Sequence, residues 1–416
     1  MQLIERDKKT RTAVICPIVK DEAKIFTSLD INEREEEASG LVLAMGQTVV
    51  FCSSYNVSKI FPRSFFGKGV VQKIKELCLE NDIELLVVDK PISAVQQKNL
   101  EKELDIKVID RTAVILEIFG RRANTNEGKL QVELAHLTYQ RGRLVRSWTH
   151  LERQRGGGGF LGGPGETQIE LDRRHIDNRI LKIKKELEKV KKTRNIQRKA
   201  RVKVPYPVVA LVGYTNAGKS TLFNKLTSAD VMAKDMLFAT LDPTMRKINL
   251  AKDKEVILSD TVGFISNLPH ELVMSFRATL EEVLEADIVM HVIDVSNPSY
   301  KVQREEVCKV LHELGLSKIE FDEKYVEVYN KIDKFSEEDI KGKNFGKGVL
   351  ISAVTGEGCE ELLKVLRDKI CKEAIVEDLV FEASDGKGIA SCYAKGEVLE
   401  RIDDIENGKI YIKIRM

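Results

Sequence analysis

The residues best suited to chemistry form a loop that can bind phosphate. The loop is Gly213-Tyr214-Thr215-Asn216-Ala217-Gly218-Lys219-Ser220, which has the spacing G-x-x-x-x-G-K-[ST]. Its glycines let backbone N–H groups wrap phosphate oxygens. Lys219 reaches the β- and γ-phosphates, and the Ser220 hydroxyl binds Mg²⁺. An apolar run, 208–213, precedes the loop and a helical pattern follows it, which is the context that the motif requires.

A second motif is suited to sensing a terminal phosphate. It is Asp260-Thr261-Val262-Gly263, and it follows the apolar run Val256-Ile257-Leu258. An acid at the end of a buried strand can hold Mg²⁺ through water, and the N–H of Gly263 can bond a γ-phosphate.

Two further motifs are suited to selecting a base. In Asn330-Lys331-Ile332-Asp333, the carboxylate of Asp333 can accept both N1–H and N2–H₂ of guanine, whereas adenine lacks that pair of donors. The aliphatic stem of Lys331 can lie along the base. Backbone N–H groups of Ile351-Ser352-Ala353 can reach the guanine O6. Four motifs in this order, each at the end of a strand, predict a GTP-binding domain.

The elements that must position these motifs predict an α/β fold. We expect a P-loop GTPase domain with a mostly parallel sheet over 205–373, because Pro205 and Pro207 mark a boundary before it. The last residues, 374–416, end in a period-2 strand, Ile410-Tyr411-Ile412-Lys413-Ile414-Arg415, and predict a small α+β C-terminal domain.

Strand–helix–strand patterning predicts a small α/β domain over 1–122, in which we find no catalytic constellation. The expected strands are 12–19, 41–52, 85–89 and 107–110, and the expected helices are 69–82 and 93–105.

A long helical hairpin is expected over 123–204. Its helices are 124–146 and 166–201, and the second has an apolar seam at Ile176, Ile180, Ile183, Leu187 and Val190. At 1.5 Å per residue the second helix would reach about 50 Å. The tip, 153–165, is glycine-rich with flanking arginines and a central Phe160-Leu161. It is either a flexible connector or a loop that orders against RNA.

Charge is distributed unevenly. Net charge is +2, but residues 172–203 hold 14 Lys/Arg against 4 Asp/Glu, a local +10 that leaves −8 for the rest of the chain. This asymmetry is either a solvated helix or a surface for nucleic acid or another polyanion.

Composition excludes several classes of protein. With 43% hydrophobic and 32% charged residues, the chain is neither disordered nor collagen-like. No apolar run approaches the roughly 18–20 residues of a membrane span, and we expect no signal peptide. Seven cysteines without a CxxC indicate reduced thiols and a cytoplasmic location.

The motifs resemble the translation-factor-related GTPases, and more closely the HflX family. The matching segments are GYTNAGKSTLFN (213–224), FATLDPTMR (238–246), DTVGFI (260–265), NKID (330–333) and RGGGGFLGGPGETQIELDRR (155–174). The resemblance implies a cytoplasmic GTPase that binds the ribosome, chiefly the large subunit and its RNA. It also implies a role in splitting or rescuing stalled ribosomes under stress. DNA and membrane partners are not expected, and we expect a monomer.

The resemblance also assigns roles to residues. It implies Mg²⁺ ligands at Ser220 and Thr240, with Thr244 the rival by spacing, and catalytic roles for Lys219, Thr240 and Gly263. Asn216 matches a position where some related GTPases bind potassium near the phosphates. Besides the phosphate loop, the implied GTP and GDP contacts are Thr221; Phe238, Ala239, Thr240, Leu241 and Asp242; Asp260, Thr261, Val262 and Gly263; Asn330, Lys331, Ile332 and Asp333; and Ser352, Ala353 and Val354.

Alternatives stay open at the level of mechanism. Phe264 stands where many GTPases carry a water-orienting glutamine, so either hydrolysis depends on a partner or Phe264 packs and another residue orients water. Two other functions compete with a GTP-driven switch. One is a ribosome-docking hibernation or assembly factor with incidental turnover, and the other is an ATP-driven RNA remodeller.

Overall fold

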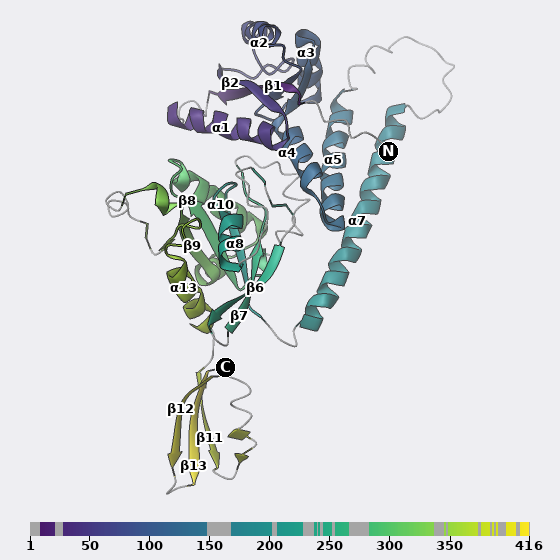
Figure 1. Cartoon of the computed structure of the whole chain (residues 1–416). Helices are drawn as coiled ribbons and strands as arrows, with labels where there is room; N and C mark the ends of the chain where they lie inside the picture. The colour runs from purple at the N-terminus through teal and green to yellow at the C-terminus, as the bar shows by residue number, and fades with distance from the viewer. Residues whose placement is uncertain are drawn as a thin grey trace, which may run out of the picture.

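Three sheets and a helical hairpin follow one another along the chain in the computed structural model (Figure 1). The structure describes residues 9–20, 28–147, 168–201, 206–227, 237–238, 240–241, 244–251, 254–265, 283–336, 345–346, 348–372, 376–382, 385–386, 388–389, 397–404 and 408–415. The glycine-rich tip 153–165, Ala239 and Asp242 lie outside these residues.

The first sheet is parallel, with strand order β2-β1-β3-β4, and belongs to the N-terminal domain. Its strands are β1 (Arg11–Val19), β2 (Thr48–Val57), β3 (Leu85–Val88) and β4 (Lys107–Asp110). One face packs against α1 (Ser28–Ala44) and α4 (Arg111–Arg122), and the other packs against α2 (Lys68–Glu80) and α3 (Ala94–Leu104). The α/β character expected from the sequence is confirmed.

The strand expected over 41–52 is wrong in its first half. Residues 41–44 are the last turn of α1, and the strand begins only at Thr48. Ala38, Leu41, Val42 and Met45 are all buried, and their spacing of 3, 1 and 3 residues is that of one helix face. The apolar run therefore packs as a helix, although its composition also suits a strand.

The expected hairpin is present and antiparallel. It consists of α5 (Asn126–Ser147) and α7 (Gln168–Arg201). Arg179 donates to both carboxylate oxygens of Glu133 at 2.6 and 2.8 Å, and Arg141 pairs with Asp177 at 2.7 Å. Ile180 and Ile183 of the predicted seam are buried.

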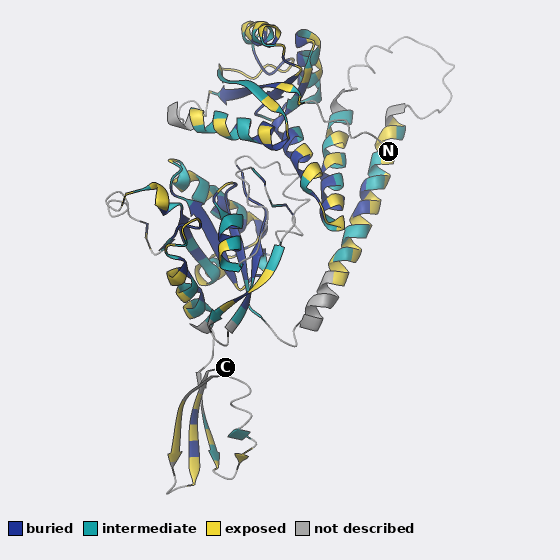
Figure 2. Cartoon of the chain, viewed as in Figure 1, coloured by how far each residue is buried: buried dark blue, intermediate teal, exposed yellow. Residues whose placement is uncertain are grey.

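The rest of α7 is largely exposed where its side chains are described (Figure 2). Although α7 is long, neither it nor any other helix in the described parts of the chain is apolar enough to cross a membrane.

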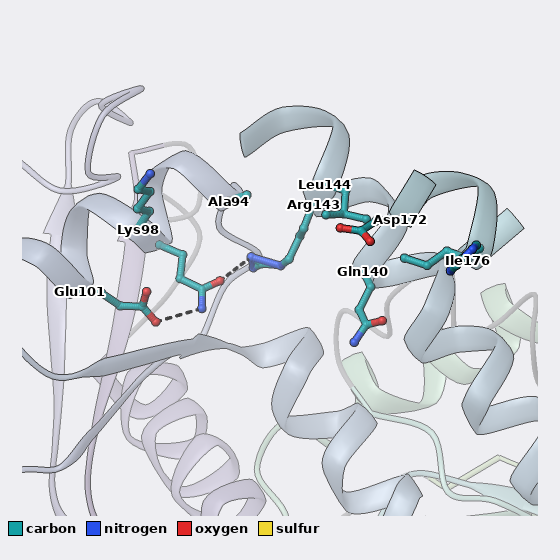
Figure 3. A pocket seen from close by; sticks show the side chains of 10 residues that line it. Ala94, Lys98, Glu101, Gln140, Arg143, Leu144, Asp172 and Ile176 are labelled. Atoms are coloured by element: carbon teal, nitrogen blue, oxygen red, sulfur yellow. Dashed lines mark hydrogen bonds between the residues drawn. The ribbon is translucent and has the colours of Figure 1, made fainter. Parts of the chain in front are cut away.

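Arg143 of α5 fastens the hairpin to the N-terminal domain. Its guanidinium donates to Asp110 Oδ2 at 3.0 Å, to the Ile92 carbonyl at 3.1 Å and to Gln97 Oε1 at 2.7 Å. It also lies 4.4 Å from the ring centroid of Tyr139, whose hydroxyl donates to Asp110. Figure 3 shows Arg143 reaching toward α3 at the edge of a groove of about 600 Å³ between α3 and the hairpin. The hairpin is thus mounted on the N-terminal domain.

The second sheet belongs to the domain that the sequence predicts to bind GTP, and it has the order β10-β9-β8-β5-β7-β6. Its strands are β5 (Val208–Gly213), β6 (Thr244–Ala251), β7 (Lys254–Asp260), β8 (Ile288–Asp294), β9 (Tyr325–Asn330) and β10 (Val349–Leu350). Among the described strands of this sheet, only the edge strand β6 runs antiparallel to its neighbour, so the prediction of a mostly parallel sheet is confirmed.

Helices cover both faces of this sheet. Leu222 of α8 (Lys219–Thr227) and Leu366 of α13 (Cys359–Lys372) pack on one face, and Leu311 of α10 (Tyr300–Leu314) packs on the other. A short helix, α11 (Lys318–Lys324), precedes β9. Burial on both faces explains why β5 and β8 are almost continuously apolar (Figure 2).

The third sheet lies at the C-terminal end of the chain (Figure 1). It is antiparallel with the order β11-β13-β12, from β11 (Val376–Glu382), β12 (Glu397–Asp404) and β13 (Lys409–Arg415). Ile410 and Ile412 of β13 are buried while Tyr411 between them is exposed, as the period-2 pattern predicts.

Candidate nucleotide site

The phosphate loop connects the carboxyl end of β5 to the first turn of α8. The Lys219 ammonium donates to the carbonyls of Gly213 at 3.1 Å and Tyr214 at 2.7 Å, so the side chain folds back over its own loop. Burial lowers the pKa of Lys219 to about 8, and the nearby charge of Asp260 opposes that shift. A phosphate bound in this loop would supply the negative charge that a buried ammonium needs.

Gly218 is required where the loop meets the Asn330–Asp333 motif. Its φ is +92°, and a Cβ there would lie 2.2 Å from Asn330 Nδ2. Asn330 donates from Nδ2 to the Ala217 carbonyl at 2.8 Å and accepts at Oδ1 from the Ala353 N–H at 2.9 Å. One buried amide therefore joins three of the four predicted motifs.

Ser220, Thr240 and Asp260 converge on one point of the site. The hydroxyls of Ser220 and Thr240 lie 2.9 Å apart and donate to Asp260 Oδ2 at 2.7 and 2.9 Å. Asp260 Oδ1 is buried and has no hydrogen-bond partner among the described residues. Burial raises the pKa of Asp260, while the two hydroxyls and the Lys219 charge lower it. Thr244, the rival of Thr240, is the first residue of β6 and lies opposite Asp260 in the β6–β7 ladder.

The Asp260–Gly263 motif lies directly against the phosphate loop. Phe264 N–H donates to the Gly213 carbonyl at 3.0 Å, and Thr215 N–H donates to the Phe264 carbonyl at 2.7 Å. A Cβ on Gly263 would lie 2.9 Å from Thr215 Cγ2 and 3.0 Å from both Lys219 Nζ and Thr215 Cα, so a larger residue would displace part of the phosphate loop. The Phe264 side chain is buried in the core, which favours the packing role that the sequence left open.

Asp294 holds the Asn330–Asp333 motif through Lys331. Lys331 has a left-handed backbone with φ 68°, and its ammonium pairs with Asp294 Oδ2 at 2.7 Å. Asp333 is exposed on the 3₁₀ turn Ile332–Lys334. Ser352 and Ala353 are buried, and the Ala353 N–H donates to Asn330. The next residue, Val354, is 70% exposed, so an apolar side chain is exposed close to this end of the site.

Several predicted contact residues direct their side chains away from the loop and into the core. Tyr214, Phe238, Leu241 and Val262 are buried in the same apolar cluster. Thr261 donates its hydroxyl to the Leu211 carbonyl at 2.6 Å. Ile332 is buried in a smaller cluster, and Thr221 is half-buried on α8. Tyr214, Phe238, Leu241 and Val262 could therefore contact a nucleotide through their backbone atoms but not through their side chains.

Two residues near the site were missed by the sequence analysis. Asp294 ends the apolar run of β8, the same pattern that drew attention to Asp260, so it could have been found. Glu37 lies on α1 of the N-terminal domain, 177 residues from its partner Tyr214, and has no local signal.

Fold and site together define a P-loop GTPase. Three family models match the chain: "GTP-binding GTPase N-terminal" over 32–120, "GTP-binding GTPase Middle Region" over 122–201 and "50S ribosome-binding GTPase" over 208–331. A protein named GTPase HflX from Magnetococcus marinus is 50% identical over 347 residues, covering 83% of this chain and 79% of its own. GTPase HflX of Escherichia coli is 41% identical, covering 94% and 91%. The chain belongs to the HflX family of GTPases and hydrolyses GTP.

A crystal structure of SsGBP with GDP is also similar. It is 26% identical, with a TM-score of 0.48, and the match covers 87% of this chain and 98% of that one.

Proposed function

We propose that this GTPase is a ribosome-associated switch that acts on the large subunit and splits or rescues stalled ribosomes under stress. The observation that carries the proposal is the basic helical hairpin α5–α7. It packs against the N-terminal domain, which in turn contacts the nucleotide site. The family model named "50S ribosome-binding GTPase" supports the same partner. We further propose a cytoplasmic monomer with domains at 1–122, 123–204, 205–373 and 374–416.

The exposed face of α7 is suited to RNA. Lys184, Lys185, Lys191 and Lys192 are all exposed along it. Ammonium groups in such a row bind phosphates and release counterions, which gives affinity without base specificity. The glycine-rich tip, 153–165, precedes α7 in the sequence, so α7 would bind RNA phosphates while the tip fits a shaped RNA surface.

Magnesium fits the cluster of oxygens in the site. The unpartnered Asp260 Oδ1 and the hydroxyls of Ser220 and Thr240 are the hard oxygen donors that this ion prefers. We propose Ser220 and Thr240 as ligands, with Asp260 acting through water. When bound, Mg²⁺ would neutralise charge on the β- and γ-phosphates.

Removing either proposed ligand should weaken Mg²⁺-dependent GTP binding. Loss of an outer-shell partner alone costs 10–100-fold in metal affinity, so Ser220→Ala and Thr240→Ala should each cost at least about tenfold. Titration of Mg²⁺ at fixed GTP would measure this, with Thr244→Ala as the matched control. A larger defect in Thr244→Ala than in Thr240→Ala would reverse the assignment.

The remaining residues have roles in binding and switching. Asp333 would recognise guanine, Lys219 would hold the β- and γ-phosphates, and the Gly263 N–H would detect the γ-phosphate. Thr240 and Gly263 would hold their segments in one arrangement while GTP is bound, and hydrolysis would release them and lower ribosome affinity.

Asn216 supports a separate proposal, a potassium ion beside the phosphates. Asn216 is exposed on the loop with φ 61°, so its amide oxygen is accessible. A cation there would supply positive charge of the kind that an arginine finger provides. GTP hydrolysis should then run faster in potassium chloride than in sodium chloride, and Asn216→Ala should remove the difference. Equal rates at matched ionic strength would refute the proposal.

Co-sedimentation with separated ribosomal subunits tests the main proposal. We expect binding to the large subunit that is stronger with GTP than with GDP or without nucleotide. Ribosomes should also accelerate multiple-turnover GTP hydrolysis. Binding without acceleration would favour the hibernation or assembly factor, and ATP-dependent unwinding that survives loss of GTP binding would favour the RNA remodeller.

A further inference from the structure

The N-terminal domain contacts the nucleotide site through α1 and α4. Figure 1 shows both helices on the side of that domain that faces the GTPase domain. Tyr214, the second residue of the phosphate loop, donates its hydroxyl to Glu37 of α1. Phe238, two residues before Thr240, packs edge-on against Phe119 of α4 with ring centroids 4.7 Å apart. Two helices of one domain therefore touch two separate parts of the other domain's site.

The carboxylate of Glu37 is held from inside the N-terminal domain. Arg111 donates to Glu37 Oε1 at 2.5 Å and, from its other terminal nitrogen, to Asp89 Oδ1 at 2.5 Å. Asp89 also pairs with Arg34 at 3.3 Å. Arg111 and Asp89 are only 3% and 2% exposed. Charges alternate along this buried chain, so every member constrains its neighbour and the orientation of Glu37 is fixed.

The backbone of Tyr214 is part of the phosphate-binding machinery. Its carbonyl accepts from the Lys219 ammonium at 2.7 Å, and the residue forms a parallel bridge with Phe264, next to Gly263. The hydrogen bond from the Tyr214 hydroxyl to Glu37 therefore also restrains the Tyr214 carbonyl, which accepts from Lys219. It likewise restrains the bridge to Phe264, next to Gly263.

We propose that Glu37 is a positioning residue that pre-organises the phosphate loop for GTP through the Tyr214 hydroxyl. The proposal rests on residues 213–220 being the phosphate loop. Because the loop already has the conformation that binds GTP, GTP binding does not have to order it. The apparent affinity for GTP is then not lowered, as it would be if only a small fraction of the molecules had that conformation. Because the Tyr214 hydroxyl points away from the reacting atoms, the effect belongs to binding and not to the chemical step.

Tyr214→Phe and Glu37→Gln test this in the full-length chain. Losing a hydrogen bond to a charged group should raise the Kd for a fluorescent GTP analogue about three- to tenfold or more. For Glu37→Gln, which lies outside the phosphate loop, the kcat at saturating GTP should stay within about twofold of wild type. In the double variant, Glu37→Gln should add little to Tyr214→Phe, because the glutamine amide has one oxygen for the two donors Arg111 and Tyr214, so both variants disrupt the same hydrogen bond.

Tyr139→Phe is the matched control. The Tyr139 hydroxyl donates to Asp110 at 2.8 Å, a tyrosine–carboxylate bond between the hairpin and the N-terminal domain. It should lower stability without changing the Kd. If Tyr214→Phe and Glu37→Gln left the Kd unchanged, if their effects were fully additive, or if Tyr139→Phe raised the Kd equally, Glu37 would have no positioning role. Lys219→Ala distinguishes failure of the Glu37 proposal from failure of the phosphate-loop assignment on which it rests. If Lys219→Ala kept the wild-type affinity for GTP, residues 213–220 would not be the phosphate loop.

Discussion

Replacing Asp333 by asparagine should lower the affinity for GTP by about a hundredfold or more and raise the affinity for XTP. Two hydrogen bonds to a carboxylate are worth about 1.5–3 kcal/mol each, and the variant loses the charge that strengthens both and the acceptor for one of them. The amide would present a donor where guanine N2–H₂ also donates, whereas the O2 of xanthine can accept. Competition between GTP and XTP for the purified protein would measure the change.

The geometry around Asp333 supports a large and selective effect. The preceding Lys331 is held by Asp294 at 2.7 Å and Asn330 is anchored at both ends of its amide, so the turn cannot easily readjust. Asp322→Asn on α11 makes the same chemical change at another exposed aspartate and should leave both affinities unchanged. If Asp333→Asn kept wild-type GTP affinity and gained none for XTP, the base-selecting role would be wrong.

Neutralising Lys184, Lys185, Lys191 and Lys192 together should weaken ribosome binding broadly. Removing one lysine–phosphate interaction reduces the slope of log K against log salt by about one, so the slope should fall by up to about four. Binding measured over a salt series would show this. Neutralising four exposed lysines of the GTPase domain, Lys301, Lys309, Lys318 and Lys364, gives the same change in net charge and should leave the slope nearly unchanged.

Alanine replacement of Gly156–Gly159 and Gly162–Gly163 should act differently from the lysine variant. Alanines restrict the φ > 0 conformations that a close RNA fit needs and favour helix across the tip. GTP affinity and the salt slope should survive, while ribosome-stimulated hydrolysis should fall. If both variants kept wild-type binding and activity, the arm would be only a spacer.

Short-range patterns in the sequence were enough to predict the phosphate loop and the strands that lead into the nucleotide motifs, but β6 and β8 were not predicted. The β5–loop–α8 segment and the end of β9 are set by contiguous residues, because a buried parallel strand is apolar throughout and each motif begins where its strand stops. The seam of α7 follows likewise from its 4, 3 spacing, since Ile180 and Ile183 are the positions that become buried.

Interactions between distant segments could not be predicted in the same way. Leu41 and Val42 are apolar in either a strand or a helix, and only packing against the first sheet decides for helix. The pairing of Tyr214 with Glu37 depends on how two domains fold against each other. Even the convergence of Ser220 and Thr240 was anticipated from a family resemblance, because the sequence spacing alone also allowed Thr244.

The apolar cluster that joins the two domains also bears on how the molecule melts. It is continuous from Ile118 and Phe119 of α4 to Val212 and Phe264 of the GTPase domain, and the Tyr214–Glu37 hydrogen bond joins the same two domains beside it. Neither core can open without exposing part of the other, so heating should produce one calorimetric transition for both domains. Nucleotide at a hundred times its Kd adds about 2.7 kcal/mol to the native state. That stabilisation would therefore protect backbone amides of the first sheet from hydrogen exchange, far from any phosphate.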